Sequence, residues 1–387
     1  MTRTTIIATC AAALLAAVPG ANAGETQKLN AFFLGNSFCE NSMPWFHPIL
    51  ARSAGCDLKV RTCFGAGWQI WMHVDQMMTR PEFSKKPLLE GDWNAVVIQH
   101  FGAHPLLQDN VRTSVFASQK EPWPEPRDVS DFAAASWIMD RLVKAHPEGR
   151  AFIYSSWPGI PAAADFRNRV AAETKKSLEA QGLPREEVLK RVRERKPTLE
   201  EMIPLMEAFY YKAEWLAKYE PNRQTPHESK HFHSRDYDWS LMELLKKKYP
   251  QLWSQRRLAL IPNGDVFYAL DQKMRAGKVP GITNIGFFSR DGGHVRAGLP
   301  RYTLAATCFA VMFRRSPEGL DYSVYNNLEN YKNENLNDLK KTPGHEGNAY
   351  SHQPDLGVLL EITPERAKVV NETVWEVVKA HLYSNIK

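Results

Sequence analysis

The 387-residue chain has few cysteines, too few for a dense disulfide framework, although an oxidising compartment would permit individual bridges. It contains five cysteines, one of which, Cys10, lies in the N-terminal apolar run. Cys56 and Cys63 are close in sequence, but the segment between them has the pattern of a strand. Its seven steps of about 3.3 Å would hold the two sulfur atoms too far apart for a bridge. The core must therefore be built by the 43% of residues that are hydrophobic.

The chain also lacks a second long hydrophobic run and a block of like charge. Arg3, the apolar residues 6–18 and the small residues ending at Ala23 match a signal peptide, which predicts cleavage after residue 23. No later stretch reaches the ~18 apolar residues that a membrane span needs. The net charge of +6 comes from lysines and arginines interspersed with glutamates, which does not favour nucleic-acid binding. We therefore expect an exported domain, residues 24–387, that is periplasmic or secreted and has no membrane span.

Short apolar runs alternate with helical patterns along most of the chain. Strands are expected at 32–34, 57–63, 95–98, 151–154 and 258–261, and helices at 44–52, 68–78, 130–145, 265–275, 299–313 and 364–382. This alternation is typical of an α/β fold with a parallel, doubly wound sheet. The alternation stops at 158–253, which is long, charged and helical, so this segment is expected to be an insertion that forms a cap.

Three residue types that catalyse acyl transfer occur at opposite ends of this pattern. Ser37 follows the first strand, at the sheet edge where α/β proteins bind ligands. Asp291 and His294 form an Asp-x-x-His run ahead of the apolar helix at 299–313. A serine needs a base to accept its proton and a third group to orient that base, and these residues supply the three roles. Cys39 is a rival nucleophile, but no neighbouring feature favours a thiolate.

These motifs resemble those of the SGNH/GDSL hydrolase superfamily, whose members are esterases and deacetylases on a flavodoxin-like α/β/α sandwich. Gly-Asn-Ser at 35–37 is similar to the first family block, with Asn in place of Asp. Gly67 matches the glycine of the second block, and Asp291 with His294 match the last block. The resemblance implies a three-layer sandwich with a five-stranded sheet and a catalytic triad of Ser37, His294 and Asp291.

The third family block, Gly-x-Asn-Asp, is absent, because residues 101–104 are Phe-Gly-Ala-His. The chain thus lacks the asparagine that donates to the oxyanion. A branch of exported bacterial SGNH-like proteins carries Gly-Asn-Ser first and a glutamine after the third strand, which would place Gln99 near the site. The expected oxyanion hole therefore consists of the backbone N–H groups of Ser37 and Gly67 and the amide of Gln99, with Gly65 as a rival to Gly67.

Other residues allow more than one interpretation. Trp68 and Trp157 could stack on a sugar ring of the substrate or simply pack in the core. His73 could face the site, but a role on the helix surface or in a hydrogen-bonded core is favoured. A zinc site would use His227, His231 and His233. That segment has the pattern of a polar loop, and we expect no metal and no cofactor.

The favoured hypothesis is serine-dependent hydrolysis of a carboxylic ester, on a small-molecule or carbohydrate substrate, with deacetylation of a carbohydrate as the candidate reaction. The competing hypothesis is an SGNH-fold protein with impaired catalysis that binds carbohydrate or acts as a scaffold, and the missing asparagine favours it. Hydrolysis of a sulfate or phosphate ester would call for a dense metal or arginine cluster, and the sequence pattern shows neither.

Overall fold

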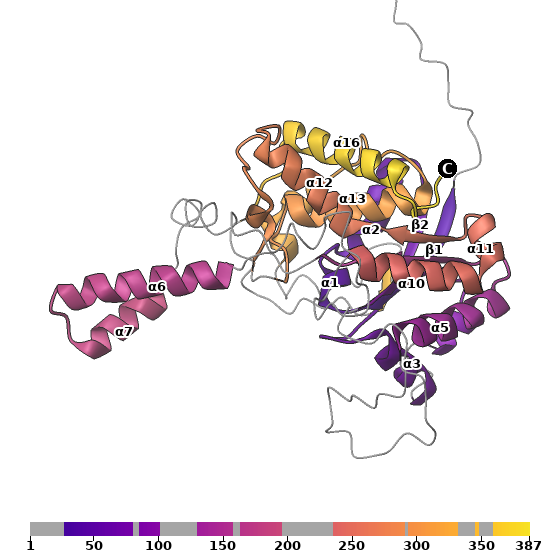
Figure 1. The fold of residues 1–387 in the computed structure, drawn as a ribbon, viewed down its shortest axis with the longest axis horizontal. Helices are drawn as coiled ribbons and strands as arrows, with labels where there is room; N and C mark the ends of the chain where they lie inside the picture. The colour runs from indigo at the N-terminus through magenta and orange to yellow at the C-terminus, as the bar shows by residue number, and fades with distance from the viewer. Residues whose placement is uncertain are drawn as a thin grey trace, which may run out of the picture.

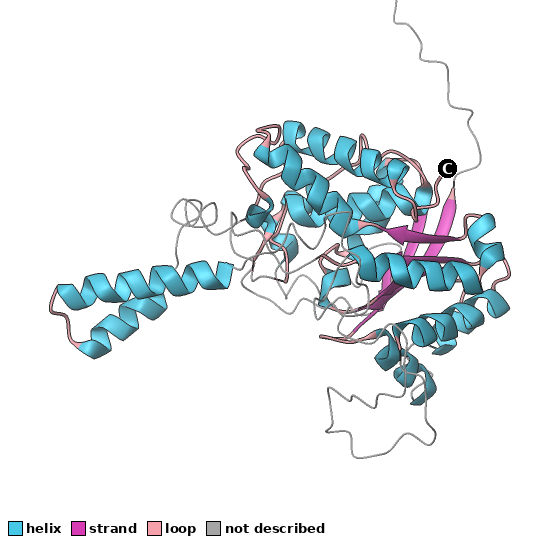
Figure 2. Cartoon of the chain, viewed as in Figure 1, coloured by secondary structure: helices cyan, strands magenta, loops and turns pink. Residues whose placement is uncertain are grey.

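The apolar runs build a parallel sheet that is covered by helices on both sides (Figures 1 and 2). The computed structural model describes residues 27–79, 85–100, 130–157, 163–195, 235–290, 293–331, 345–347 and 359–387. The strands are β1 (Lys28–Gly35), β2 (Asp57–Phe64), β3 (Ala95–Gln99), β4 (Arg150–Tyr154), β5 (Leu258–Ile261) and β6 (His345–Gly347). Their order across the sheet is β5-β4-β3-β1-β2-β6, and every pair is parallel.

All five predicted strands are confirmed, and in the order of a flavodoxin-like sheet. The structure adds a sixth, β6, at the edge next to β2. Glu346 of β6 forms ion pairs with Arg61 at 3.0 Å and Lys59 at 2.9 Å. Three residues without an apolar pattern give no strand signal, so this edge was missed.

Alternate residues along each strand face different helix layers, which explains why the strands read as continuous apolar runs. Phe33 of β1 packs in one hydrophobic cluster, whereas Phe32 and Leu34 pack in the other. The first layer contains α2 (His47–Ser53), α12 (Asn263–Arg275), α13 (Leu299–Phe313) and α16 (Pro364–Ala380). The second contains α3 (Ile70–Thr79), α4 (Lys85–Glu90), α5 (Asp131–Ala145), α10 (Arg235–Lys248) and α11 (Pro250–Ser254). The predicted three-layer α/β sandwich is confirmed.

The remaining elements are short or lie apart from the sheet. They are α1 (Ser37–Glu40), η1 (Pro44–Phe46), α6 (Ala163–Ala180), α7 (Arg185–Glu194), η2 (Ile285–Phe288), α14 (Ser323–Asn326) and η3 (Leu328–Tyr331). The helix expected from residue 68 begins at Ile70 instead. The ring of Trp68 packs directly over Gly65, where an added Cβ would lie only 2.0 Å from Cδ2 of the indole, so the chain completes a turn before the helix starts.

The segment expected to be a cap divides into two parts. Helices α6 and α7 pack on each other, and Figure 1 shows them projecting away from the sheet. Helix α10, by contrast, belongs to the second helix layer, where Leu241, Met242 and Leu245 are fully buried. Residues 235–253, which precede β5 in the chain, thus belong to the second helix layer of the sandwich. That the rest of the segment forms a cap stays a prediction.

The expected signal peptide, residues 1–23, lies outside the described residues. Within the part of the chain that is described, no helix has both the length and the apolar character needed to cross a membrane.

Two fully buried histidines support the chain around β1. Nε2 of His47 donates to the carbonyl oxygen of Ser42 at 3.0 Å, and Nε2 of His73 donates to that of Gly35 at 3.1 Å. Burial lowers the pKa of each imidazole from 6.5 to about 4, because a charged ring loses its hydration in the core. Both side chains are therefore neutral at pH 7, and His73 has the hydrogen-bonded core role that the sequence favours.

These shifted pKa values predict a loss of stability in mild acid. Between pH 6.5 and about 4 the unfolded chain binds protons that the folded chain does not, so the free energy of unfolding falls as the pH falls. The slope is about 1.4 kcal/mol per pH unit for each histidine. Urea unfolding at pH 6.5 and pH 5 should show a decrease that is about 1.6 kcal/mol smaller in His73→Gln than in the wild type. Equal decreases would show that His73 accepts a proton in the folded state.

Candidate active site

Strand β1 delivers Ser37 to the edge of the sheet where the strands end. From Leu29 to His47, every residue is buried except Ser37, which is partly exposed. Ser37 is the first residue of α1, which follows β1. In the sheet, β1 lies between β2 on one side and β3 on the other. In an open parallel sheet, ligands bind where the strand order reverses in this way. The fold therefore exposes one hydroxyl at the position where a ligand is expected.

Asn36 fixes the backbone that carries Ser37. It is the N-cap of α1, and its Oδ1 accepts a hydrogen bond from the N–H of Phe38 at 3.0 Å. Its Nδ2 donates to the carbonyl oxygen of Trp68 at 2.8 Å. An ionised aspartate could cap the helix but could not donate to that carbonyl. This second bond requires an amide at position 36.

Gly35 is required by a close approach, not by its backbone angles. A Cβ atom at this position would lie 2.8 Å from Cβ of Cys39 and 3.0 Å from Oε1 of Gln99. Contacts that short are not tolerated, so only glycine lets α1 turn back against the end of β3.

His294 comes to Ser37 on a loop between η2 and α13. The loop is closed by an antiparallel bridge between Ser289 and Val295 and by a hydrogen bond of 2.9 Å from the N–H of Arg290 to the carbonyl oxygen of His294. At its tip, Nε2 of His294 lies 2.8 Å from Oγ of Ser37. The ring of Phe38 lies beside the imidazole, with the centroids 5.7 Å apart. The serine and the histidine that the sequence singles out are thus within hydrogen-bond distance.

Asn41 connects the two loops through a single amide. Its Nδ2 donates to the carbonyl oxygen of Ser37, and its Oδ1 accepts a hydrogen bond of 2.9 Å from the N–H of Val295. Val295 directly follows His294, so this side chain joins the backbone beneath the nucleophile to the backbone beside the base. Asn41 is buried, and sequence reasoning missed it because a polar residue four positions after a serine carries no pattern.

Trp157 is hydrogen-bonded to the loop that carries His294. Its Nε1 donates to the carbonyl oxygen of Gly293 at 2.9 Å, and its ring packs between Phe38 at 5.0 Å and Phe267 at 5.1 Å. The side chain is fully buried, so in this structure it is not placed to stack on a sugar ring. Of the two interpretations, core packing is the one that this geometry fits.

Gln99, the predicted oxyanion donor, is also fully buried. Its Oε1 accepts a hydrogen bond of 2.8 Å from the N–H of Asn36, and its Nε2 donates to the carbonyl oxygen of His100. His100 is itself buried, and its Nε2 contacts Oδ1 of Asp238 on α10. Burial alone would lower the pKa of His100, but the carboxylate outweighs it and the pKa lies above its ordinary value. Gln99 lies beside the site, engaged with the backbone; its donor role stays a prediction.

Gly67 lies in the turn after β2 with a φ of 64°, in the left-handed region that favours glycine. It precedes the helix by three residues, since α3 begins at Ile70, so the helix dipole does not act on it directly. Trp68 is half-buried, and its ring lies 5.0 Å from that of His73. The hydrogen bond from Asn36 to the carbonyl oxygen of Trp68 holds the turn that contains Gly67 and Trp68 next to α1.

Asp291 lies outside the described residues, and so do His227, His231 and His233. Within the described ranges, no group of three or more His, Cys, Asp or Glu side chains could hold a metal ion. Cys39 is buried, and burial raises the pKa of its thiol well above the ordinary value. A thiol that resists ionisation is a poor nucleophile, so Ser37 is the better candidate.

Comparisons with known proteins give only solved structures of low similarity to this chain. No protein-family model matches the chain, and no curated protein matches it significantly. A DUF4886 family protein from Bacteroides uniformis is 12% identical over 92% of this chain and 96% of its own, with a TM-score of 0.43. A protein from Slackia heliotrinireducens, described as a candidate SGNH hydrolase, is 15% identical over 57% and 98% of the two chains, with a TM-score of 0.23. A possible lipase from Chitinophaga pinensis is 11% identical over 35% and 51%, with a TM-score of 0.23.

The bridge made by Asn41 predicts a specific loss of serine reactivity. Asn41→Leu removes both hydrogen bonds, so the rate at which a fluorophosphonate probe labels Ser37 should fall at least tenfold, about 1.4 kcal/mol. Asn326 is a matched control, because its amide bridges the N–H and carbonyl of Ile362 in the same way, at 2.8 and 2.9 Å, on another segment. Asn326→Leu should lose similar stability and keep the labelling rate. Similar labelling in both variants would separate Asn41 from the site.

The engagement of Gln99 predicts a loss of stability. Gln99→Ala leaves the buried N–H of Asn36 without its acceptor, which should lower the free energy of unfolding by about 1–3 kcal/mol. A side chain that only donated to an oxyanion would leave stability unchanged when removed. Chemical denaturation of the wild type and the variant distinguishes the two roles.

Proposed function

We propose that the protein is a serine esterase of the SGNH type, and that Ser37 and His294 carry its chemistry. The observation that supports this most directly is the 2.8 Å separation of Nε2 of His294 from Oγ of Ser37. Within residues 29–48, 284–290 and 293–302, Ser37 and His294 are also the only two residues that are partly exposed and have a side chain able to exchange a proton.

The reaction follows from this contact. Oγ of Ser37 attacks the carbonyl carbon of the ester while its proton passes to Nε2 of His294. The new C–O bond places negative charge on the former carbonyl oxygen. When the tetrahedral intermediate collapses, the bond to the alcohol breaks and the imidazolium returns the proton to the departing alkoxide. Water then attacks the acyl-serine by the same steps, with His294 again acting as the base.

The two remaining roles are proposals of the same scheme. Asp291, three residues before His294, would accept a hydrogen bond from Nδ1 and so hold the imidazole in the tautomer that leaves Nε2 free to act as a base. The N–H of Ser37, at the start of α1, and the N–H of Gly67 would donate to the oxyanion. Neither N–H is bonded to a described residue, so both are available.

The substrate is proposed to be a small acyl ester, with an acetylated carbohydrate as the candidate. A carbohydrate-binding or scaffold protein is favoured by one observation, namely that both groups of the Gln99 amide are already bonded to backbone. Without that donor an esterase would rely on two N–H groups, which lowers its rate but does not abolish it, since one donor contributes about 10²–10³ in kcat.

Replacement of Ser37 tests the proposal. Ser37→Ala should reduce hydrolysis of p-nitrophenyl acetate by on the order of 10³-fold or more, because the nucleophile is lost. The matched control is Cys39→Ala, which removes the thiol two residues after Ser37 on the same helix and should keep the activity. The fluorophosphonate adduct should appear by mass spectrometry in the control and be missing from Ser37→Ala.

Two results would count against the esterase. A wild type that neither hydrolyses activated esters nor reacts with the probe would support the binding or scaffold protein. Loss of activity in Cys39→Ala but not in Ser37→Ala would move the nucleophile to the thiol.

A further inference from the structure

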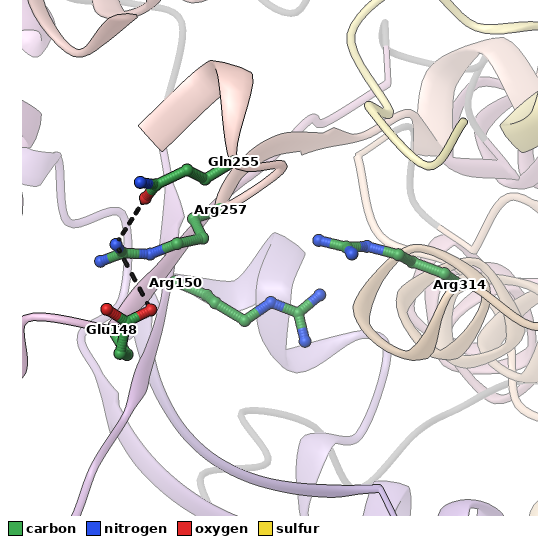
Figure 3. Close-up of a pocket in the computed structure, with 5 residues that line it drawn as sticks. All are labelled: Glu148, Arg150, Gln255, Arg257 and Arg314. Atoms are coloured by element: carbon green, nitrogen blue, oxygen red, sulfur yellow. Dashed lines mark hydrogen bonds and ion pairs between the residues drawn. The ribbon is translucent and has the colours of Figure 1, made fainter. Parts of the chain in front are cut away.

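A hollow lies on the side of the sheet where the strands begin, opposite the side that carries Ser37, and arginines line most of it (Figure 3). Its volume is about 320 Å³, and its lining residues are Glu148, Arg150, Gln255, Arg257 and Arg314. Arg150 is the first residue of β4, Arg257 directly precedes β5, and Arg314 follows the last residue of α13. Three segments that are distant in sequence therefore bring guanidinium groups to one place.

The positive charge of this hollow is not balanced by the protein around it. Glu148 is the single carboxylate among the lining residues, and its side chain is 93% exposed and 3.8 Å from Arg257. An ion pair at that distance whose carboxylate is almost fully solvated contributes little. Burial and the neighbouring Arg256 lower the pKa of Arg314, so a further cation lies close to the lining residues. An anion entering the hollow would thus meet an excess of positive charge.

Donors remain available on the two guanidinium groups that face each other in Figure 3, those of Arg150 and Arg314. Each group has five N–H donors. Nη2 of Arg150 bonds the carbonyl oxygen of Met312 at 2.8 Å, whereas its buried Nε has no acceptor among the described residues. Burial and the neighbouring Arg314 lower the pKa of Arg150 to about 10, which shows that the two cations disfavour each other.

The backbone at this hollow is also unusual. Arg314 ends α13 in the left-handed region with a φ of 55°, and Arg256 has a φ of 59°. Glycine is the residue that usually takes this conformation after a helix, because a side chain there costs of order 1 kcal/mol or more. The chain carries arginine at both positions, and of the two Arg314 lines the hollow.

We propose that this hollow binds a tetrahedral oxyanion, a phosphate or sulfate group. A group with oxygen atoms on several sides can bond Arg150 and Arg314 together, and a free sulfate or phosphate dianion neutralises two facing guanidinium groups where a carboxylate or a single sulfate ester neutralises one. Arginine suits this role because its planar fork of donors matches the oxygens of phosphate. The group is either a free inorganic ion or a substituent of an anionic polysaccharide. The site is separate from Ser37 and does not depend on the proposed esterase activity.

Calorimetric titration with inorganic phosphate, inorganic sulfate and a sulfated heparin oligosaccharide tests the site. Arg314→Gln should weaken binding of the best ligand at least tenfold, and Arg150→Gln should do the same. Arg315→Gln is the matched control, since it removes the same charge from the next residue, whose Nη1 instead bonds the Ala54 carbonyl at 2.8 Å and Sγ of Cys56 at 3.1 Å. The control should bind as the wild type does.

The probes also identify the source of the group. Binding of phosphate or sulfate alone assigns a free ion, and binding of the oligosaccharide with competition by phosphate assigns a polymer-bound group. Either result supports the site only if Arg314→Gln loses the binding. The proposal is overturned if none of the three probes binds the wild type, or if Arg314→Gln and Arg315→Gln bind equally.

Discussion

The candidate active site depends on the hydrogen bond that joins His294 to Ser37 across 257 positions of sequence. Closing so long a loop has an entropic cost that no single contact offsets, so the sheet must bring the two segments together first. What remains is local precision, and buried polar contacts supply it. The Asn41 amide ties the Ser37 carbonyl to the N–H beside His294, and the Trp157 indole holds the carbonyl of Gly293. A shift of either loop would leave buried polar groups without partners, which costs about 1–3 kcal/mol for each group.

The strand order explains why this precision lies between β1 and β3. Chain connections leave the two strands in opposite directions, so a gap opens beyond their ends. The protein fills the base of that gap with amides: Gln99 of β3 accepts from the N–H of Asn36, and Asn36 donates to the turn after β2. A glycine at 35 is the condition for this packing. The residues around Ser37 are therefore buried and hydrogen-bonded to one another, and Ser37 alone among residues 29–48 is partly exposed.

Much of the fold follows from the sequence, because buried parallel strands are short apolar runs separated by amphipathic helices, and this pattern is local. β5 was predicted with its observed bounds, 258–261. The short β6 was not, since its place depends on pairing with β2 and not on its own residues. Ser37 and His294 could be found from residue type and position, whereas the direction of a side chain could not. Gln99 and Trp157 lie at the expected strand ends, yet their polar atoms bond backbone, a result decided by neighbours distant in sequence.

In a parallel sheet all strands begin on one side and end on the other, and the two sides carry different chemical groups in this chain. At the strand ends, the polar groups bonded to the backbone and side chain of Ser37 and to Asn36 are amides and an imidazole. At the strand starts three guanidinium groups gather around one hollow. β4 spans the distance between the edges, and its four residue steps correspond to about 13 Å. Among the described residues, Oγ of Ser37 is bonded to His294, and none of the residues that line the hollow is hydrogen-bonded to Ser37. An anion in the hollow would reach the proposed active site directly only if it belonged to a polymer long enough to extend past both ends of the strands.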